Sequence, residues 1–359
     1  MGLVAEQVSR IAIHLKERGL TEAWNYAFFR VFYGVHSPFI SKFMNIWAPY
    51  PPYIEVEVTT KCNLRCLMCE HTYWHEPSRD MSYDQFLHIM QQFPRLKWIG
   101  LTGIGESFLN KDFMKMIEYC KHRKIYVEIF DTFFYWDKEI SYRMVDLGLN
   151  RALPSFDAAT EKTYKLIRAN SDFNRVVAHL RSLFEAKSEK SRKLPEVCFH
   201  YIVSKANIDE MSLYLDLIRD IAGDQPVEVQ YTEVLSAFKE VEDQLVQIPD
   251  SLMHDVEKKS NDLKIKLHWN RNTYRKKPQL CQCTLWTMPF IFVTGDVIPC
   301  CGGNEANRRD FQKETSLGNV FVDDFRTIWK GKKYGILRSL LRENTIPAQC
   351  RNCPSFRIS

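Results

Sequence analysis

The sequence lacks long uncharged apolar runs. No stretch offers the roughly 18 consecutive apolar residues that a membrane-spanning helix needs. The nearest, residues 23–50, is interrupted by Arg30, His36 and Lys42, and Pro38 would kink a helix there. The opening residues, MGLVAEQVSRIAIHLKERG, have neither the apolar core nor the small-residue cleavage site of a secretory signal. These absences predict a cytoplasmic protein whose thiols stay reduced.

The sequence also has little net charge. Its 49 basic and 44 acidic side chains leave a formal charge of only +5, so nothing in the balance indicates a nucleic-acid partner. A hydrophobic share of 45% and a charged share of 26% are ordinary for a globular protein. We therefore expect a folded chain with a substantial core and no nucleic-acid partner.

Cysteine, by contrast, is plentiful. Eleven cysteines in a chain of 359 residues are many for a cytoplasmic protein. In a reducing compartment, clustered cysteines bind metal or perform chemistry more often than they form disulfides. The positions of these cysteines are therefore the best guide to function.

From Tyr53 onward, strand-like and helix-like segments alternate. Strand patterns are predicted at 53–58, 98–102, 125–130, 151–156, 196–203 and 227–231. Helical spacing fills the intervals, for example over 139–148, which ends on a glycine. About six βα units predict an α/β fold with a parallel sheet that curls toward a partial barrel.

The composition suggests four parts. Residues 1–50 form an aromatic, amphipathic N-terminal segment, 51–235 the barrel, 236–280 a charged linker and 281–359 a small cysteine-rich module. Within the first part, Trp24, Phe28, Val31, Phe32 and Val35 recur at helical spacing. Such a face could lie on a membrane, enclose an apolar substrate or pack across the barrel.

Three cysteines fall in TTKCNLRCLMCE, residues 59–70, directly after the first strand. Cys62, Cys66 and Cys69 have the spacing C-x3-C-x2-C. Thiolate cages for zinc or iron-sulfur clusters usually need four ligands, so three leave one metal position open. The loop lies at the carboxyl end of a strand, where α/β folds bind ligands. A zinc knuckle lacking a ligand is the alternative on these residues alone.

This loop resembles the cluster loop of the radical S-adenosylmethionine (SAM) superfamily. The resemblance implies a partial (β/α)6 TIM-like barrel in which three cysteines hold a [4Fe-4S] cluster whose fourth iron binds SAM. It implies reductive cleavage of SAM to a 5'-deoxyadenosyl radical that abstracts hydrogen from a substrate C–H. The cofactor then carries the difficult chemistry, and the protein supplies placement and tuning.

A second segment, LTGIGESFL (101–109), supports the resemblance. Gly103, Gly105 and Glu106 match the family's Gly-Gly-Glu-Pro motif, which implies that Glu106 holds the amino group of SAM. Ile104 and Ser107 depart from the motif, so alone it would equally suit a plain βα turn.

A third segment, residues 154–168, resembles the family's stretch with serine and aspartate before a helix. Ser155 and Asp157 occupy its polar positions, and Arg168 is expected to meet the SAM carboxylate. Each of these residues could equally be a helix cap or a surface pair.

The C-terminal cysteines resemble the SPASM/Twitch extension of radical SAM enzymes, which binds auxiliary clusters. Cys300, Cys350 and Cys353 are the expected ligands of one auxiliary [4Fe-4S] cluster, and the fourth is Cys281 or Cys283. Cys301 is expected to point away. A zinc ribbon remains the alternative, because four thiolates suit zinc equally well.

The resemblance leaves the substrate open. We expect a radical SAM oxidoreductase that modifies a C–H bond of a small molecule or lipid, with a ribosomally made peptide as the alternative substrate. A non-catalytic iron-sulfur electron carrier is a third interpretation. A reductase such as flavodoxin or ferredoxin is the expected electron donor, and the N-terminal segment is an expected point of peripheral membrane contact.

Overall fold

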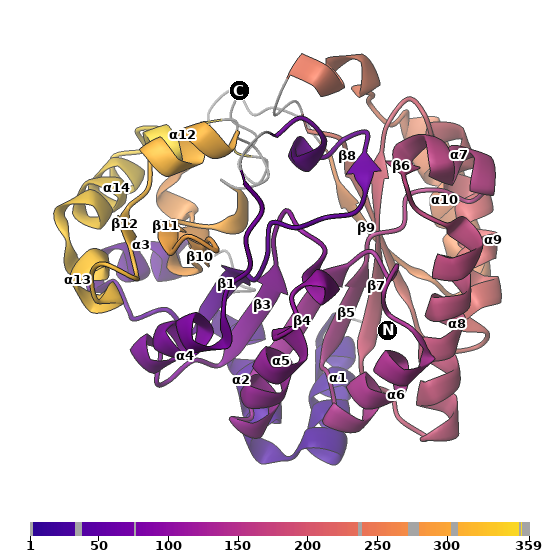
Figure 1. Ribbon diagram of the computed structural model, residues 1–359, viewed down its shortest axis with the longest axis horizontal. Coiled ribbons are helices and arrows are strands. Elements are labelled where there is room, and N and C mark those ends of the chain that lie inside the picture. Colours follow the sequence, from indigo (N-terminus) through magenta and orange to yellow (C-terminus); the bar gives the residue numbers. More distant parts are fainter. Residues whose placement is uncertain are drawn as a thin grey trace. The chain divides into compact units, whose positions relative to one another are not determined.

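The computed structural model describes residues 3–32, 38–74, 77–235, 239–271, 280–302, 308–351 and 353. They form two compact units (Figure 1). The first comprises Met1–Thr60, Ser78–Val127 and Thr273–Ser359, and the second Lys61–Pro77 and Glu128–Asn272. The four-part domain division expected from the sequence stays a prediction.

The first unit is built on parallel strands that the C-terminal module extends. The strand order is β12 (Gly318–Asn319), β11 (Asp296–Ile298), β10 (Phe290–Ile291), β1 (Tyr53–Glu57) and β3 (Trp98–Thr102). β1 runs parallel to both β3 and β10, whereas β10–β11 and β11–β12 are antiparallel. The late cysteine-rich segment therefore adds to the edge of the first strand of the chain. Sequence periodicity does not reveal this pairing.

Helices and short 3-10 turns surround these strands. They are α1 (Leu3–Arg18), α2 (Leu20–Phe32), α3 (Pro38–Trp47), α4 (Tyr83–Gln92), η2 (Ser107–Leu109), α5 (Phe113–His122), η5 (Leu280–Gln282), η6 (Leu285–Thr287), α12 (Arg309–Glu314), α13 (Phe325–Lys330), α14 (Lys332–Arg342) and η7 (Ala348–Cys350). α4 begins with a capping box, in which Ser82 and Gln85 each bond the other's backbone amide.

The N-terminal helices cap the starting ends of the strands. Tyr26 of α2 is fully buried in an aromatic cluster with Tyr53, Trp98 and Tyr126. These three are the first residues of β1, β3 and β4 (Tyr126–Asp131). A buried ion pair adds to the contact, because Lys121 Nζ of α5 lies 2.7 Å from Glu22 Oε2 of α2. The N-terminal segment thus packs at the amino ends of the strands.

The sequence left open whether the aromatic stripe of α2 packs on the barrel or stays exposed, and the described part of that stripe is not the buried face of the helix. Ala23 and Tyr26 are buried, whereas Trp24 is 60% exposed and Phe28 is half-buried. Trp24 and Phe28, spaced four residues apart, form the outer stripe. Val31 and Phe32 lie in α2 with side chains outside the described residues, and Val35 lies outside them altogether.

The second unit is a parallel α/β sheet. Its order is β4, β5 (Arg151–Pro154), β7 (Glu196–Val203), β8 (Glu228–Glu233) and β9 (Lys266–Asn270), and each pair is parallel. Helices line its outer side, as Figure 1 shows for α6 (Lys138–Leu147), α8 (Phe173–Glu189), α9 (Met211–Ala222) and α10 (Asp250–Asp262). The remaining elements are β2 (Arg65–Cys66), η1 (Glu70–Thr72), α7 (Glu161–Ile167), β6 (Arg168–Ala169), η3 (Ile208–Glu210) and η4 (Lys239–Gln244).

The expected α/β class and parallel strands are confirmed. All six predicted strands are present, and α6 ends at Gly148 in the left-handed conformation (φ 68°), as the glycine predicted. The segment 236–280, expected to be a linker, instead contains α10 and β9, which pairs with β8. Its strand is short and only half-buried, so its apolar signal is weak. Within the described ranges, every helix is too short or too polar to cross a membrane.

Candidate active site

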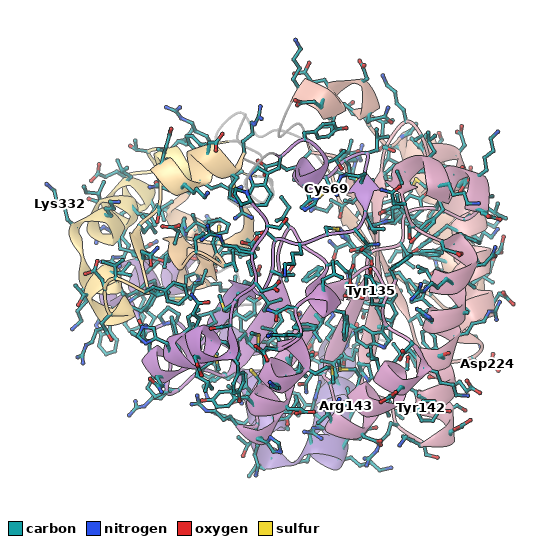
Figure 2. The ribbon with its side chains drawn as sticks, viewed as in Figure 1. Cys69, Tyr135, Tyr142, Arg143, Asp224 and Lys332 are labelled. Carbon is teal, nitrogen blue, oxygen red and sulfur yellow. The ribbon has the colours of Figure 1, made fainter. Side chains whose placement is uncertain are left out.

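The first cysteine loop belongs to the second unit and is folded tightly on itself. The Cys69 amide donates to the Cys66 carbonyl (3.1 Å), and Thr72 Oγ1 donates to the same carbonyl (2.7 Å). β2 pairs antiparallel with β6, so that Cys66 lies opposite Arg168. Cys66 is buried, whereas Cys62 and Cys69 are partly exposed. Figure 2 shows Cys69 in the turn beyond β2.

Arg168 links this loop to the interior of the second unit. Its Nη1 lies 3.7 Å from Cys66 Sγ, and its Nε donates to Asp157 Oδ2 at 2.7 Å. Both side chains are buried. Asp157 Oδ1 in turn accepts from the Ile202 amide at 2.7 Å. Burial opposes the charge of Arg168, but Asp157 and then Cys66 outweigh it and raise the pKa of the guanidinium. A fixed positive charge therefore lies beside the Cys66 sulfur.

The three sulfurs of this loop influence one another. Burial, followed by the charges of Cys66 and then Cys62, raises the pKa of the Cys69 thiol to about 12. Three thiolates in such a loop need a metal to offset their repulsion. Among the described residues, no three Cys, His, Asp or Glu side chains converge on one ion. The donor set fits a multi-iron cluster, in which each thiolate binds a different iron.

The predicted Gly103–Glu106 loop lies in the first unit, directly after β3. Gly103 has φ +138°, and a Cβ there would lie 2.5 Å from Glu57 Cγ, so only glycine fits. Glu57 Oε1 accepts from the Ile104 amide at 3.3 Å. Glu106 is buried, and Gly105 is half-buried at the surface of the same turn.

A buried ion pair that the sequence did not reveal supports this turn. Glu57, the last residue of β1, pairs with Arg309 of α12, and its other oxygen accepts from the Val293 amide at 3.2 Å. The Arg309 guanidinium lies 4.1 Å from the centre of the Phe292 ring. Through these contacts, the C-terminal module packs against the Gly103–Glu106 turn. The sequence offers one signal for this ion pair. The alternation of YIEVEV (53–58) places the Glu57 carboxylate at the end of a strand.

Ser155, directly after β5, is the neighbour of His200 in the middle of β7. The Ser155 amide donates to the Asp131 carbonyl (2.8 Å), and Ser155 forms a parallel bridge with His200. His200 Nε2 lies 3.0 Å from Thr232 Oγ1. Burial is the main cause that lowers the pKa of His200, and Asp157 opposes it. The second unit thus brings Ser155 and Asp157 close to His200.

The aromatic run after β4 divides into two pairs. Phe133 and Trp136 are fully buried and stacked, with ring centres 4.3 Å apart. Phe134 and Tyr135 are partly exposed, and the Arg175 guanidinium lies 4.5 Å from the Phe134 ring. Tyr135 is labelled in Figure 2. The buried pair packs beneath the loop, and the other pair contacts Arg175 at its surface.

The C-terminal cysteines lie in the first unit, and three of them are close together. Burial and then Cys353 raise the pKa of the Cys283 thiol to about 12. Burial, Cys283 and Cys353 likewise raise the pKa of Cys350. Cys283 is therefore near enough to Cys350 and Cys353 for charges on these thiols to affect one another's pKa. The Cys281 carbonyl accepts from Asn45 Nδ2 of α3 (3.2 Å), which ties its backbone to the N-terminal segment. Cys300 lies near Tyr334 and influences its pKa.

Two further cysteines, Cys120 and Cys198, lie in regular elements of the fold. Cys120 is fully buried in α5, and burial raises the pKa of its thiol to about 12. Cys198 is buried in β7. Both occupy core positions, where a thiol packs as a small hydrophobic group.

Comparison with known proteins finds two matching segments in the chain. Residues 56–218 match the model of the radical SAM superfamily, and residues 281–354 match that of an iron-sulfur cluster-binding domain, SPASM. A tungsten-containing aldehyde ferredoxin oxidoreductase cofactor-modifying protein of Pyrococcus furiosus is 24% identical over 315 residues, which cover 84% of this chain and 86% of that protein. A probable GTP 3',8-cyclase of Methanocaldococcus jannaschii is 26% identical over 47% of this chain and 56% of its own length.

Solved structures agree on the fold. SuiB of Streptococcus suis bound to S-adenosylmethionine has a TM-score of 0.63 at 13% identity, with 93% of this chain and 84% of SuiB covered. SuiB bound to its precursor peptide SuiA gives a TM-score of 0.61 at 14% identity, over 86% of this chain and 71% of that one. Residues 56–218 therefore belong to the radical SAM superfamily, with its SAM-binding [4Fe-4S] cluster, and residues 281–354 form a SPASM domain that binds auxiliary iron-sulfur clusters.

Proposed function

We propose that this protein cleaves SAM reductively and uses the resulting radical to abstract hydrogen from a C–H bond of a small molecule or lipid. The observation that carries the proposal is the loop of Cys62, Cys66 and Cys69, held beside a buried Arg168–Asp157 pair. When bound, the cluster and SAM supply one-electron chemistry that no side chain can perform. The chain's own residues bind, orient and shield these groups.

Each site residue has a role in this proposal. Cys62, Cys66 and Cys69 hold three irons, and Gly103, Gly105 and Glu106 receive the amino end of SAM. We assign Ser155, which follows β5 and bridges to His200, to bonding the cofactor. Because Arg168 already bonds Asp157 and approaches Cys66 Sγ, we assign it to fixing the cluster's charge, with the SAM carboxylate as a second partner.

For the auxiliary cluster we propose Cys283, Cys300, Cys350 and Cys353 as ligands. The mutual influence of Cys283, Cys350 and Cys353 on their pKa values supports Cys283 over Cys281. A single auxiliary cluster uses four of the six cysteines after residue 280. Its role is to relay electrons or to hold the substrate.

The small-molecule class is favoured over the peptide class by the relatives. The relative that covers most of this chain is named for modifying a cofactor, and the second is named for a cyclisation of GTP. The likeness to SuiB, at 13% identity, concerns the fold alone. A ribosomally made peptide remains the second candidate, because the same fold is seen with a bound precursor peptide. Electrons would come from a reductase such as flavodoxin or ferredoxin, and membrane contact through the N-terminal segment is a separate proposal.

Formation of 5'-deoxyadenosine tests the core of the proposal. Anaerobically reconstituted protein, reduced with dithionite in the presence of SAM, is expected to release 5'-deoxyadenosine and methionine. If the fully loaded protein released neither, it would be an electron carrier and the proposal would fail.

Hydrogen abstraction can then be assigned to a substrate class. Cell extract from cultures grown in deuterated medium is separated into lipid, small-molecule and peptide fractions. The fraction with the substrate is expected to add deuterium to the 5'-deoxyadenosine, as measured by mass spectrometry. Incorporation from the peptide fraction alone would replace the small-molecule proposal with the peptide one.

A further inference from the structure

The first unit contains a cavity that is distinct from the residues of the proposed chemistry. It has a volume of about 860 Å³ and is lined by residues from α2, α3, α13 and the segments before β1 and β3. Tyr50 and Pro52 precede β1, and Arg95 and Lys97 precede β3. The Gly103–Glu106 turn follows the other end of β3, and a strand of five residues spans about 16 Å. The cavity therefore opens at the amino ends of the strands.

The walls of the cavity are apolar. Phe28, Phe43, Met44, Pro49, Pro52 and Trp329 contribute to them. Trp329 is held in place, because its Nε1 donates to the Ala48 carbonyl at 3.0 Å. The Tyr50 hydroxyl donates to the Gln92 carbonyl at 2.7 Å. Cavities of this size with apolar walls and a few polar groups are typical of sites for small amphiphilic ligands.

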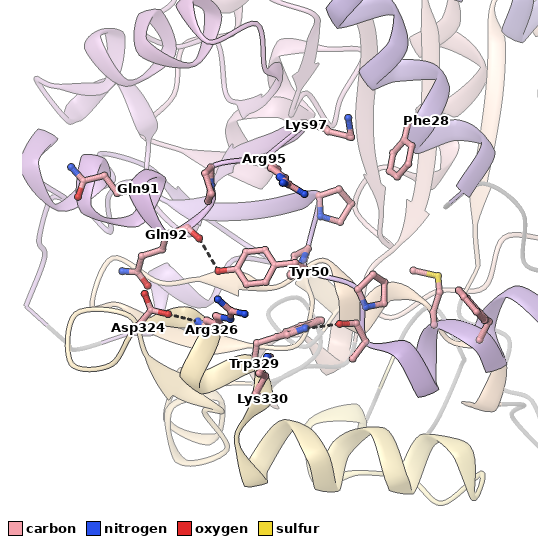
Figure 3. A pocket seen from close by; sticks show the side chains of 17 residues that line it. Phe28, Tyr50, Gln91, Gln92, Arg95, Lys97, Asp324, Arg326, Trp329 and Lys330 are labelled. Carbon is pink, nitrogen blue, oxygen red and sulfur yellow. Dashed lines mark hydrogen bonds between the residues drawn. The ribbon is translucent and has the colours of Figure 1, made fainter.

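The rim of the cavity is basic. Figure 3 shows Arg95 and Lys97 on one side of Tyr50, and Arg326 and Lys330 on the other. Arg95, Arg326 and Lys330 are exposed. Across the chain segments that the structure describes, none of these four cations lies within 4.0 Å of a carboxylate oxygen. Asp324 is the one acidic residue of the lining, and its Oδ1 accepts from the Arg326 amide. The rim thus offers positive charge to an anion.

The surface beside the cavity carries large apolar side chains. On α3, Phe43, Ile46 and Trp47 are 48%, 61% and 73% exposed, and the Phe43 and Trp47 rings are in contact. On α2, Trp24 lies one turn from Phe28, which lines the cavity. Exposed aromatic residues next to basic ones are the composition of helices that lie in a membrane interface.

We propose that this cavity and the adjoining faces of α2 and α3 dock on an anionic phospholipid bilayer. One acyl chain enters the cavity, the lipid phosphate meets Arg95, Arg326 and Lys330, and Trp24, Ile46 and Trp47 insert at the headgroup level. A concave apolar site with a cationic rim favours a lipid over a partner protein, whose interface would be flatter. The inference is independent of the proposed reaction.

Sedimentation with vesicles tests the proposal on the full-length holoprotein. It is expected to sediment with vesicles that contain phosphatidylglycerol and to bind pure phosphatidylcholine vesicles much more weakly. The double variant Arg326→Gln/Lys330→Gln should weaken binding to these vesicles about 25-fold. Each basic residue near an anionic surface strengthens binding by roughly fivefold, and the two effects multiply. Trp47→Ser should weaken binding to anionic vesicles at every salt concentration, because its contribution is apolar.

A matched control distinguishes binding through this site from a nonspecific effect of the protein's net charge. Arg192→Gln/Lys258→Gln removes the same charges from exposed positions of the second unit and should leave vesicle binding unchanged. Equal weakening in the control, absence of vesicle binding, or binding of a soluble acidic peptide in place of vesicles would each overturn the proposal. Release of 5'-deoxyadenosine in solution is a separate readout, so failure of the docking proposal is distinguishable from failure of the proposed function.

Discussion

The two sets of cysteines in this chain are organised in opposite ways. Cys62, Cys66 and Cys69 lie within eight residues, and hydrogen bonds inside one loop define their arrangement. Cys283, Cys350 and Cys353 approach one another although up to 70 positions separate them, counted as 353 minus 283. The first set is a local motif, because its spacing is defined within one loop and does not require distant parts of the chain. The second exists only after the C-terminal module has packed against β1, so its assembly depends on folding.

The largest expected effect is loss of SAM cleavage when the local set is broken. Cys66→Ala should lower the rate of 5'-deoxyadenosine formation by about 10³-fold or more, because the cluster loses a ligand at the SAM-binding site. Cys353→Ala should retain part of the cleavage and lose turnover or stability. The core cysteine variant Cys120→Ala is the control. Equal and complete loss in a folded Cys353 variant would contradict separate roles for the two sets.

The next largest effect is a loss of iron that depends on which cysteine of the C-terminal set is removed. Cys283→Ala should remove about four irons per chain from the reconstituted protein, because a [4Fe-4S] cluster would be lost. Cys281→Ala should remove none. Iron and zinc analysis of both variants measures this. Iron loss in Cys281→Ala alone would reverse the assignment, and stoichiometric zinc in place of iron would indicate a zinc ribbon.

A smaller effect is expected from breaking the Asp157–Arg168 pair, which lies beside Cys66. Asp157→Asn leaves Arg168 buried without its carboxylate, which should lower the free energy of unfolding by about 3–5 kcal/mol. Asp220→Asn removes one partner of an ion pair in which both side chains are largely exposed, and should cost less than about 1 kcal/mol. Urea unfolding of the two variants gives the comparison. Similar losses would show that burial of the Arg168 pair has little effect.

The smallest effect is a pH dependence near the same site. The folded protein lowers the pKa of His200 through burial, so the unfolded chain takes up this proton first as the pH falls. His200 therefore stabilises the fold at neutral pH, and that contribution declines as the pH drops below about 6.5. Unfolding of the wild type should be more acid-sensitive than that of His200→Gln between about pH 7.5 and about pH 5.5. The exposed His122→Gln is the control, and equal acid sensitivity in all three proteins would contradict the prediction.

The sequence predicted those parts of the fold that depend on neighbouring residues. Strand alternation located β1, β3, β4, β5, β7 and β8 within a few residues, and the glycine at 148 marked the end of α6. It failed for β9, whose residues are only half-buried and carry a weak pattern. It left open which face of α2 packs inward, because an amphipathic helix with aromatic residues on both faces does not show which face is buried. Tyr26 packs inward, and Trp24 does not.

The sequence by itself determined the chemistry of the local site. Three thiols in one loop and glycines after a strand are features of adjacent residues, so their spacing alone points to a cluster and a cofactor. Only the tertiary structure decided which distant groups meet them. It forms the Glu57–Arg309 and Asp157–Arg168 pairs, brings Cys283 near Cys350 and Cys353, and builds the basic-rimmed cavity at the amino ends of the strands, all from residues that are not neighbours in the chain. Such contacts arise from burial of polar groups in a packed core, which local spacing does not encode.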